Sequence, residues 1–151
     1  TQELPYPSNI SGCTIKRLTI EKNVIEGAQH AIQLSAVHME GRVDDFWGYP
    51  VPPFDAEKGY STLAEGNWIN QVKIVDNEII EYDIALLLHG AWGCNHTLSK
   101  NNVIGPDYEI HGNRLDGGRK VFCYAKYKTD QLMYGDAVGF GNRVIGDWNM
   151  K

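Results

Sequence analysis

The stretch Gly12–Ala36, GCTIKRLTIEKNVIEGAQHAIQLSA, recurs at Gly66–Gly90 as GNWINQVKIVDNEIIEYDIALLLHG. The two copies align without a gap. A pattern repeated at a fixed spacing indicates a repeat architecture, in which each copy stacks on the next. The positions that are identical in both copies are Gly12/Gly66, Ile15/Ile69, Ile20/Ile74, Asn23/Asn77, Ile25/Ile79, Ala31/Ala85 and Leu34/Leu88.

Each copy contains short runs in which apolar and polar residues alternate. Leu18–Ile20 and Ile32–Leu34 are such runs in the first copy, and Val72–Ile74 is the equivalent of the first of them. Alternation in aliphatic and β-branched residues predicts β-strands. No segment shows the apolar stripe of an amphipathic helix, so the sequence predicts an all-β chain. Residues 121–128 predict a longer strand, and the glycine-rich residues 135–141 predict a turn or bulge.

An asparagine stands between two strands in each copy, at Asn23 and Asn77. A weaker copy follows with Asn101, at less than half that interval after Asn77, and Asn113 and Asn142 are later echoes. We expect these asparagines at corners that need a positive φ, which asparagine tolerates. Strands stacked at about 4.8 Å would let their side chains bond amide to amide. We therefore interpret these residues as scaffold.

The N-x-[IV] corners at Asn23, Asn77, Asn101 and Asn142, with I-x-L strands beside them, resemble right-handed parallel β-helices of the pectin-lyase-like superfamily. The resemblance is at the level of the fold. It implies a single all-β solenoid domain over residues 1–151, with less regular coils over 106–151. It also implies an incomplete or fragmentary helix, because the chain is short for this fold. Polysaccharide lyases, glycosidases and phage tailspikes share the fold, so the resemblance implies a secreted, extracellular or cell-surface protein.

The spacing of the copies predicts an insertion. If the short interval from Asn77 to Asn101 is the true period, the longer interval from Asn23 to Asn77 has surplus residues, which fall within Val37–Glu65. Pro50, Pro52 and Pro53 forbid a regular central strand there. Long loops in compact domains are usually functional or disordered, and the aromatic residues of this one favour order. We predict that residues 37–65 form one wall of a binding cleft.

Candidate site residues cluster in this insertion. Hydrolysis of a glycosidic bond needs two carboxylates, one as acid and one as base or nucleophile. Glu81 and Asp83 lie at the matching turn of the next copy, and His89 replaces Ser35 of the first. Each of these side chains also has an ordinary structural or solvated interpretation. The predicted catalytic residues are Glu40, Asp44, Asp45 and His89, and the predicted substrate-binding residues are His38, Arg42, Trp47, Tyr49 and Trp92.

Other chemistry stays open. Elimination on a uronan would need a basic residue such as Arg42, His38 or Lys100. Asp44 and Asp45 would suit Ca²⁺, the one cofactor that we consider. Cys13, Cys94 and Cys123 lack the spacing of a zinc site, and we predict buried free thiols.

Composition restricts the partners. The 151 residues carry a net charge of −5 with acids and bases interspersed, which argues against a nucleic-acid partner. A mean hydropathy of −0.37 without a long apolar run argues against membrane insertion. The chain opens with Thr1 and no apolar signal core, so we expect a processed product or a piece of a longer protein.

Two functions follow from the resemblance. The first is cleavage of a polysaccharide or oligosaccharide by a glycosidase, transferase or lyase reaction. The alternative is a non-catalytic glycan-binding or tailspike-like adhesion module, or a structural segment of a larger β-helix assembly. The partners would be a glycan and either a second copy or the rest of a longer chain.

Overall fold

The computed structural model describes residues 8–36, 45–46, 49–50, 62–90, 92–93, 97–118, 121–126, 132–133 and 138–150. Side chains are described within 11–36, 64–90, 98–118 and 139–150. The regular elements of these residues are β-strands, as the alternation predicts. Most of the strands are short, with two to four residues.

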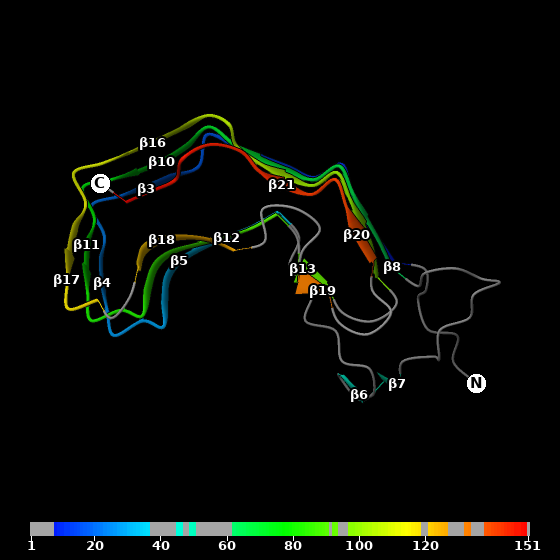
Figure 1. Cartoon of the computed structure of the whole chain (residues 1–151), viewed down its shortest axis with the longest axis horizontal. Helices are drawn as coiled ribbons and strands as arrows, with labels where there is room; N and C mark the ends of the chain where they lie inside the picture. Colours follow the sequence, from blue (N-terminus) through cyan, green and yellow to red (C-terminus); the bar gives the residue numbers. More distant parts are fainter. Residues whose placement is uncertain are drawn as a thin grey trace.

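The chain makes three successive passes through the same set of parallel sheets and a fourth through the first two of them, and each pass is called a coil here (Figure 1). Coil 1 contains β1 (Ser8–Ser11), β2 (Thr14–Lys16), β3 (Thr19–Glu21), β4 (Val24–Glu26) and β5 (His30–Ser35). Coil 2 contains β8 (Thr62–Glu65), β9 (Trp68–Asn70), β10 (Val72–Val75), β11 (Glu78–Ile80) and β12 (Ile84–His89).

The later coils follow the same path. Coil 3 contains β14 (Thr97–Lys100), β15 (Val103–Ile104), β16 (Tyr108–His111), β17 (Arg114–Asp116) and β18 (Val121–Lys126). Coil 4 contains β20 (Val138–Phe140) and β21 (Arg143–Val144), followed by residues 145–150. The remaining strands are β6 (Asp45–Phe46), β7 (Tyr49–Pro50), β13 (Trp92–Gly93) and β19 (Leu132–Met133).

Equivalent strands of successive coils pair in parallel and form five sheets. Sheet A has the order β1-β8-β14-β20, and sheet B has the order β2-β9-β15-β21. Sheets C, D and E have the orders β3-β10-β16, β4-β11-β17 and β5-β12-β18. Figure 1 looks along the stack, so that the strands of each sheet lie one behind another. This all-β arrangement of stacked parallel sheets is compatible with a parallel β-helix.

The register confirms the alignment of the first two copies. Ile20 pairs with Ile74 and Ile25 with Ile79, in the same frame as the bond between Asn23 and Asn77. The next interval is shorter, because Ile74 pairs with Ile110 of coil 3. Coil 2 also begins earlier than the sequence pattern predicts. Its first strand, β8, begins at Thr62, within the predicted insertion, and pairs with β1.

The core lies inside the stack, where aliphatic residues of successive coils lie over one another. Ile74, Ile79, Leu86, Leu88 and Ile104 are fully buried. Their burial is the main stabilising contribution, at roughly 1.5–3 kcal/mol for each side chain. The expected apolar stack is therefore present.

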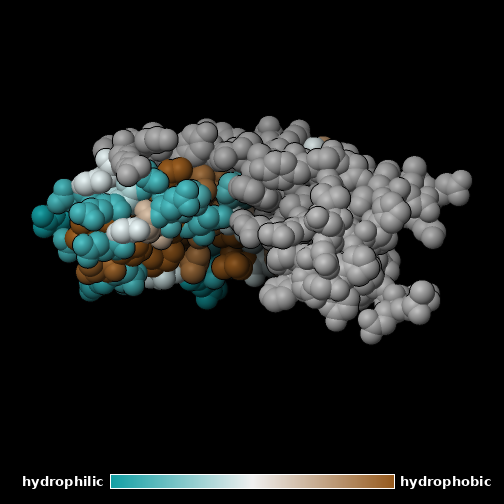
Figure 2. All heavy atoms as spheres, turned by 90° about the horizontal axis from the view of Figure 1, so that it is seen from below, coloured by the Kyte–Doolittle hydropathy of each residue, from teal (hydrophilic) through white to brown (hydrophobic). Residues whose placement is uncertain are grey.

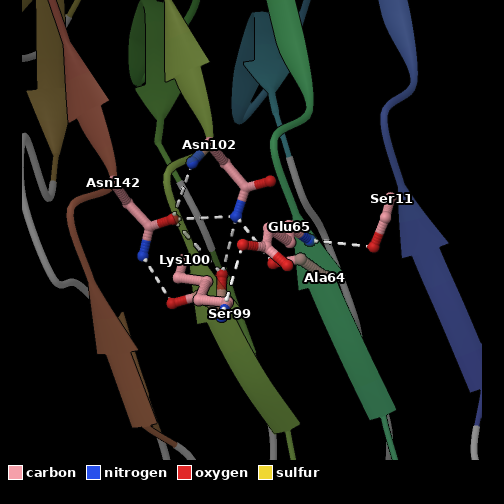
Figure 3. Close-up of polar contacts among 7 residues, drawn as sticks. All are labelled: Ser11, Ala64, Glu65, Ser99, Lys100, Asn102 and Asn142. Atoms are coloured by element: carbon pink, nitrogen blue, oxygen red, sulfur yellow. Dashed lines mark hydrogen bonds and ion pairs between the residues drawn. The ribbon is translucent and has the colours of Figure 1, made fainter.

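Two asparagine ladders run along the stack. At the corner between sheets A and B, the side-chain N–H of Asn67 donates to Oδ1 of Asn102 at 2.8 Å. Asn102 donates in the same way to Asn142 at 2.8 Å, as Figure 3 shows. At the corner between sheets C and D, Asn23 donates to Asn77 at 3.0 Å, and Asn77 donates to Asn113 at 2.9 Å. The amide-to-amide bonds predicted from the stacking are thus confirmed.

The prediction for Asn101 was correct in its positive φ at a corner and wrong in its place in the ladder. Asn102 occupies the ladder and is fully buried, whereas Asn101 is exposed. The positive φ also belongs to the preceding residue: Lys22, Asp76 and Asn101 have φ of 56°, 54° and 56°. The chain turns at that residue, and the asparagine after it points inward. The short period fails because Asn77 and Asn102 stand at different corners of the stack.

Two smaller predictions also change. Cys13 is exposed rather than buried, because it lies in coil 1 at the end of the stack. Part of the predicted turn at residues 135–141 is strand β20, which pairs with β14.

Candidate functional site

Most of the predicted site residues lie outside the described part of the chain. They are His38, Glu40, Arg42, Asp44 and Trp47. Asp45 and Tyr49 are placed by their backbone, on two strands that pair antiparallel with Phe46 opposite Tyr49. The side chains of this hairpin lie outside the described part.

Two further predicted residues lie in sheets. Trp92 is in β13, opposite Leu132 of β19, and its side chain is outside the described part. His89 ends β12, between Ser35 and Lys126 of the neighbouring strands, and is 0% exposed. A substrate arriving from solvent cannot contact a side chain without exposed surface, so the site considered below does not include His89.

A hollow of about 500 Å³ lies at the corner where the chain passes from sheet D to sheet E. Three coils contribute to its walls, so it runs along the stack. This D–E corner is at the lower left of Figure 1. Its lining residues are Gly27, Ala28, Gln29, Glu81, Tyr82, Asp83 and Gly117.

The hollow exists because glycine flanks Glu81 on both sides. The N–H of Gly27 donates to the carbonyl of Ile80, and the N–H of Glu81 donates in the same way to that of Asp116. Gly27, Glu81 and Gly117 are therefore equivalent residues of three coils. Neither glycine carries a side chain that would fill the space above or below the carboxylate.

Glu81 has a backbone conformation that glutamate rarely adopts. Its φ is 52°, and the equivalent glycines have φ of 71° and 72°. This left-handed conformation favours glycine, and a side chain there costs about 1–2 kcal/mol. Lys22, Asp76 and Asn101 have the same conformation at another turn of the coils, so it belongs to the path of the chain and is not specific to this hollow.

Tyr82 forms the floor beside Glu81 and is 3% exposed. A side chain on Gly118 would overlap its ring, so a glycine in coil 3 makes room for the tyrosine. Burial raises the pKa of Tyr82, and the negative charge of Asp116 raises it further. The phenol is therefore protonated at neutral pH and can donate a hydrogen bond.

The hollow offers carboxylates, an amide and a phenol. Glu81 and Asp83 can accept hydrogen bonds from hydroxyl groups or exchange protons with them, and Gln29 can donate and accept. Among the described lining residues none is cationic. These groups can bind the hydroxyl groups of a ligand.

The sequence identified Glu81 and Asp83 but missed Gln29 and Tyr82. The signal for Gly27 was present, because the repeat aligns this glycine with Glu81. The positions of Gly117 and Gly118 beside the hollow could not be predicted, because they depend on the register between coils 2 and 3. The short period that the sequence suggested gives the wrong register for these coils.

A second, smaller hollow of about 370 Å³ lies on sheet B beside Trp68. The indole N–H of Trp68 donates to the carbonyl of Gly105 at 2.7 Å, which fixes the ring. The ammonium of Lys16 lies 4.7 Å from the ring centroid, at cation–π distance. Asn101 and Arg143 line the same hollow.

Within the described residues, no three His, Cys, Asp or Glu side chains lie close enough together to hold a metal ion. The predicted Ca²⁺ site at Asp44 and Asp45 falls outside the side chains that the structure describes and stays a prediction.

No helix in the described part of the chain is long and apolar enough to cross a membrane. No family model, curated protein or solved structure matches the chain.

Proposed function

We propose that this chain is a right-handed parallel β-helix of the pectin-lyase-like type that cleaves a polysaccharide. The observation that supports the proposal best is the hollow at the D–E corner, where Glu81 and Asp83 lie beside the buried phenol of Tyr82. The hollow crosses three coils, which gives an extended ligand room along the stack.

The reaction that suits these groups is hydrolysis. One of the two groups, as the protonated carboxylic acid, protonates the leaving oxygen. The other, as the carboxylate, either activates the attacking water or attacks as nucleophile to form an intermediate that water then hydrolyses. The buried ring of Tyr82 forms the floor beside these two groups. Elimination on a uronan would place an anionic sugar against two carboxylates without a described cation beside it, so we propose a neutral glycan as substrate.

The test is a screen of neutral and acidic polysaccharides for new reducing ends and for unsaturated products. Against the substrate found, Glu81→Gln and Asp83→Asn should each lower kcat by roughly 10²-fold or more, as loss of an acid or base does. Glu78→Gln is the matched control, because Glu78 lies on the adjacent strand outside the hollow, within 3.9 Å of Arg114. Its kcat should be unchanged.

The same screen separates this site from the one predicted in residues 37–65. If Asp44→Asn or Asp45→Asn abolishes turnover while both hollow variants keep full activity, the D–E corner is not the active site. Unsaturated products would refute hydrolysis.

A second candidate function is glycan binding without cleavage, which the fixed indole of Trp68 favours. Aromatic faces beside polar groups are common in binding sites for small molecules. In this case a glycan would bind without any product, and Trp68→Ala would abolish binding while Glu81→Gln would not.

A further inference from the structure

The two ends of the stack differ in how well they are covered. In coil 1, Ile15 is 51% exposed, and Ile20 and Ile25 are half-buried. The equivalent residues of coil 2, Ile69, Ile74 and Ile79, are 5%, 0% and 0% exposed. Figure 2 shows the stack from its side, where hydrophobic residues lie between hydrophilic ones in the coloured part.

The opposite end of the stack is closed by the residues that follow β21. Trp148 and Met150 are 2% and 6% exposed and belong to the core. The ring of Trp148 lies 4.6 Å from that of Tyr108 in coil 3, and its indole N–H donates to Ile145 at 2.8 Å. One end is therefore capped, and the other presents the inner side chains of coil 1.

Hydrogen bonding at the open end is also incomplete among the described residues. The asparagine ladder shows which group is involved, because each of its asparagine-to-asparagine bonds is donated toward the following coil. Asn23 donates both its backbone and side-chain N–H to Oδ1 of Asn77, at 3.0 Å each. Asn77 donates in the same way to Asn113. The part of the chain that the structure describes brings no donor to Oδ1 of Asn23. This oxygen would accept the same two bonds from a preceding coil.

The backbone of coil 1 points to the same conclusion. The N–H groups of Lys73 and Glu78 reach back to the carbonyls of Leu18 and Asn23, at 2.8 Å each. Their equivalents in coil 1 are the N–H groups of Thr19 and Val24, which face away from coil 2. In the described sheets, β3 and β4 each stand at the edge, with one neighbouring strand.

We propose that this open end binds one more β-coil, which continues the stack before coil 1. The added coil would pair in parallel with β2, β3 and β4 and would cover Ile15, Ile20 and Ile25 with aliphatic side chains. Its residue at the C–D corner would donate backbone and side-chain N–H groups to Asn23, which an asparagine does. Addition of a strand to an exposed sheet edge is an established mode of peptide recognition.

A second copy of the chain fits this surface poorly. Two copies meeting through coil 1 would bring the Oδ1 atoms of both Asn23 side chains together, as acceptor against acceptor. A copy meeting it through its other end would present the cap of Trp148 and Met150. In that arrangement Asn142 would also meet Cys13, which has no amide oxygen to accept its N–H.

The test uses the full chain and a fluorescein-labelled synthetic peptide with the sequence of residues 11–36. Coil 1 already stacks on coil 2 in the required manner, so its own sequence is a suitable probe. We expect saturable binding by fluorescence anisotropy, and slower hydrogen exchange at the amides of Thr14, Thr19 and Val24. Ile20→Lys should weaken binding by roughly ten-fold or more, since it removes about 1.5–3 kcal/mol of apolar burial.

Thr19→Lys is the matched control, because Thr19 is exposed on the same short strand. It should bind the peptide like the unmodified chain. Lack of saturable binding up to about 1 mM, the limit of a weak complex, would overturn the proposal. Equal binding by the Ile20→Lys variant, or self-association of the chain that Ile20→Lys removes, would overturn it as well. The exchange measurement needs no variant and stands if Ile20→Lys fails to fold.

Discussion

At the scale of single residues, Tyr82 links the corner hollow to the pH dependence of stability. Burial and the charge of Asp116 raise its pKa in the folded state. In the unfolded chain the phenol ionises near its usual pKa of about 10. Above that pH the unfolded state releases a proton that the folded state retains, so the free energy of unfolding falls.

We therefore predict a difference between the unmodified chain and Tyr82→Phe in alkaline solution. The contribution of the neutral phenol is fully present below about pH 10 and is lost as the pH rises through the raised pKa. The variant lacks this term, so its free energy of unfolding should fall less steeply in that range. Urea unfolding at a series of pH values measures both slopes, and identical slopes would show that Tyr82 is not shielded.

Residue-level prediction from sequence succeeded where a residue depends on the repeat and failed where it depends on a neighbouring coil. Ile20 and Ile25 pair with the residues that the repeat aligns with them, because the apolar residues of both copies pack into the same core. The sequence could not show Tyr82 as buried, because the glycine that admits its ring belongs to coil 3 and is distant in the chain. Most of the predicted site lies outside the described residues, so those assignments remain predictions.

At the scale of the elements, each asparagine ladder ties three strands together across the stack. Asn77 is the central member and is 1% exposed, with Asn23 on one side and Asn113 on the other. Its side-chain N–H also donates to the carbonyl of Ile20 at 3.0 Å. Asn23 has only one such neighbour in the described residues and is exposed to water.

This difference predicts unequal costs for the same substitution. Asn77→Ala removes hydrogen bonds on both sides and leaves their buried partner groups without a hydrogen bond. It should therefore lower the free energy of unfolding by about 2–4 kcal/mol. Asn23→Ala should lower it by only about 1 kcal/mol, because water can replace the lost partner. Urea denaturation of both variants measures the two values, and equal losses would contradict the ladder as a stabilising element.

The strands themselves were largely predictable, and their alignment only in part. The sequence pattern located β3, β5, β10 and β18 closely, because one face of each strand must be apolar. The pairing of coils 2 and 3 was misassigned, since each of these two coils has asparagine at two corners and composition does not distinguish the corners.

At the scale of the whole molecule, the cap over coil 3 completes the core. Trp148 is almost fully buried, although it lies outside any strand near the end of the described residues. Trp148→Ala should lower the free energy of unfolding by about 3–5 kcal/mol, the usual cost of deleting a buried tryptophan. Phe140→Ala is the control, because Phe140 is an aromatic of the same coil that is 47% exposed. Thermal unfolding followed by circular dichroism compares them, and similar melting temperatures would refute the role of the cap.

The coils keep their register although the chain between them varies in length. The connections from sheet E back to sheet A span residues 36–61, 90–96 and 127–137, whereas the path from sheet A to sheet E is nearly constant. Changes in length are thus confined to one side of the stack, where the closure of a longer loop costs little free energy. Peptides or small domains grafted into residues 94–96, after β13 and before β14, would leave the pairing of β13 with β19 and the five sheets aligned, which makes this short interval suited to modification.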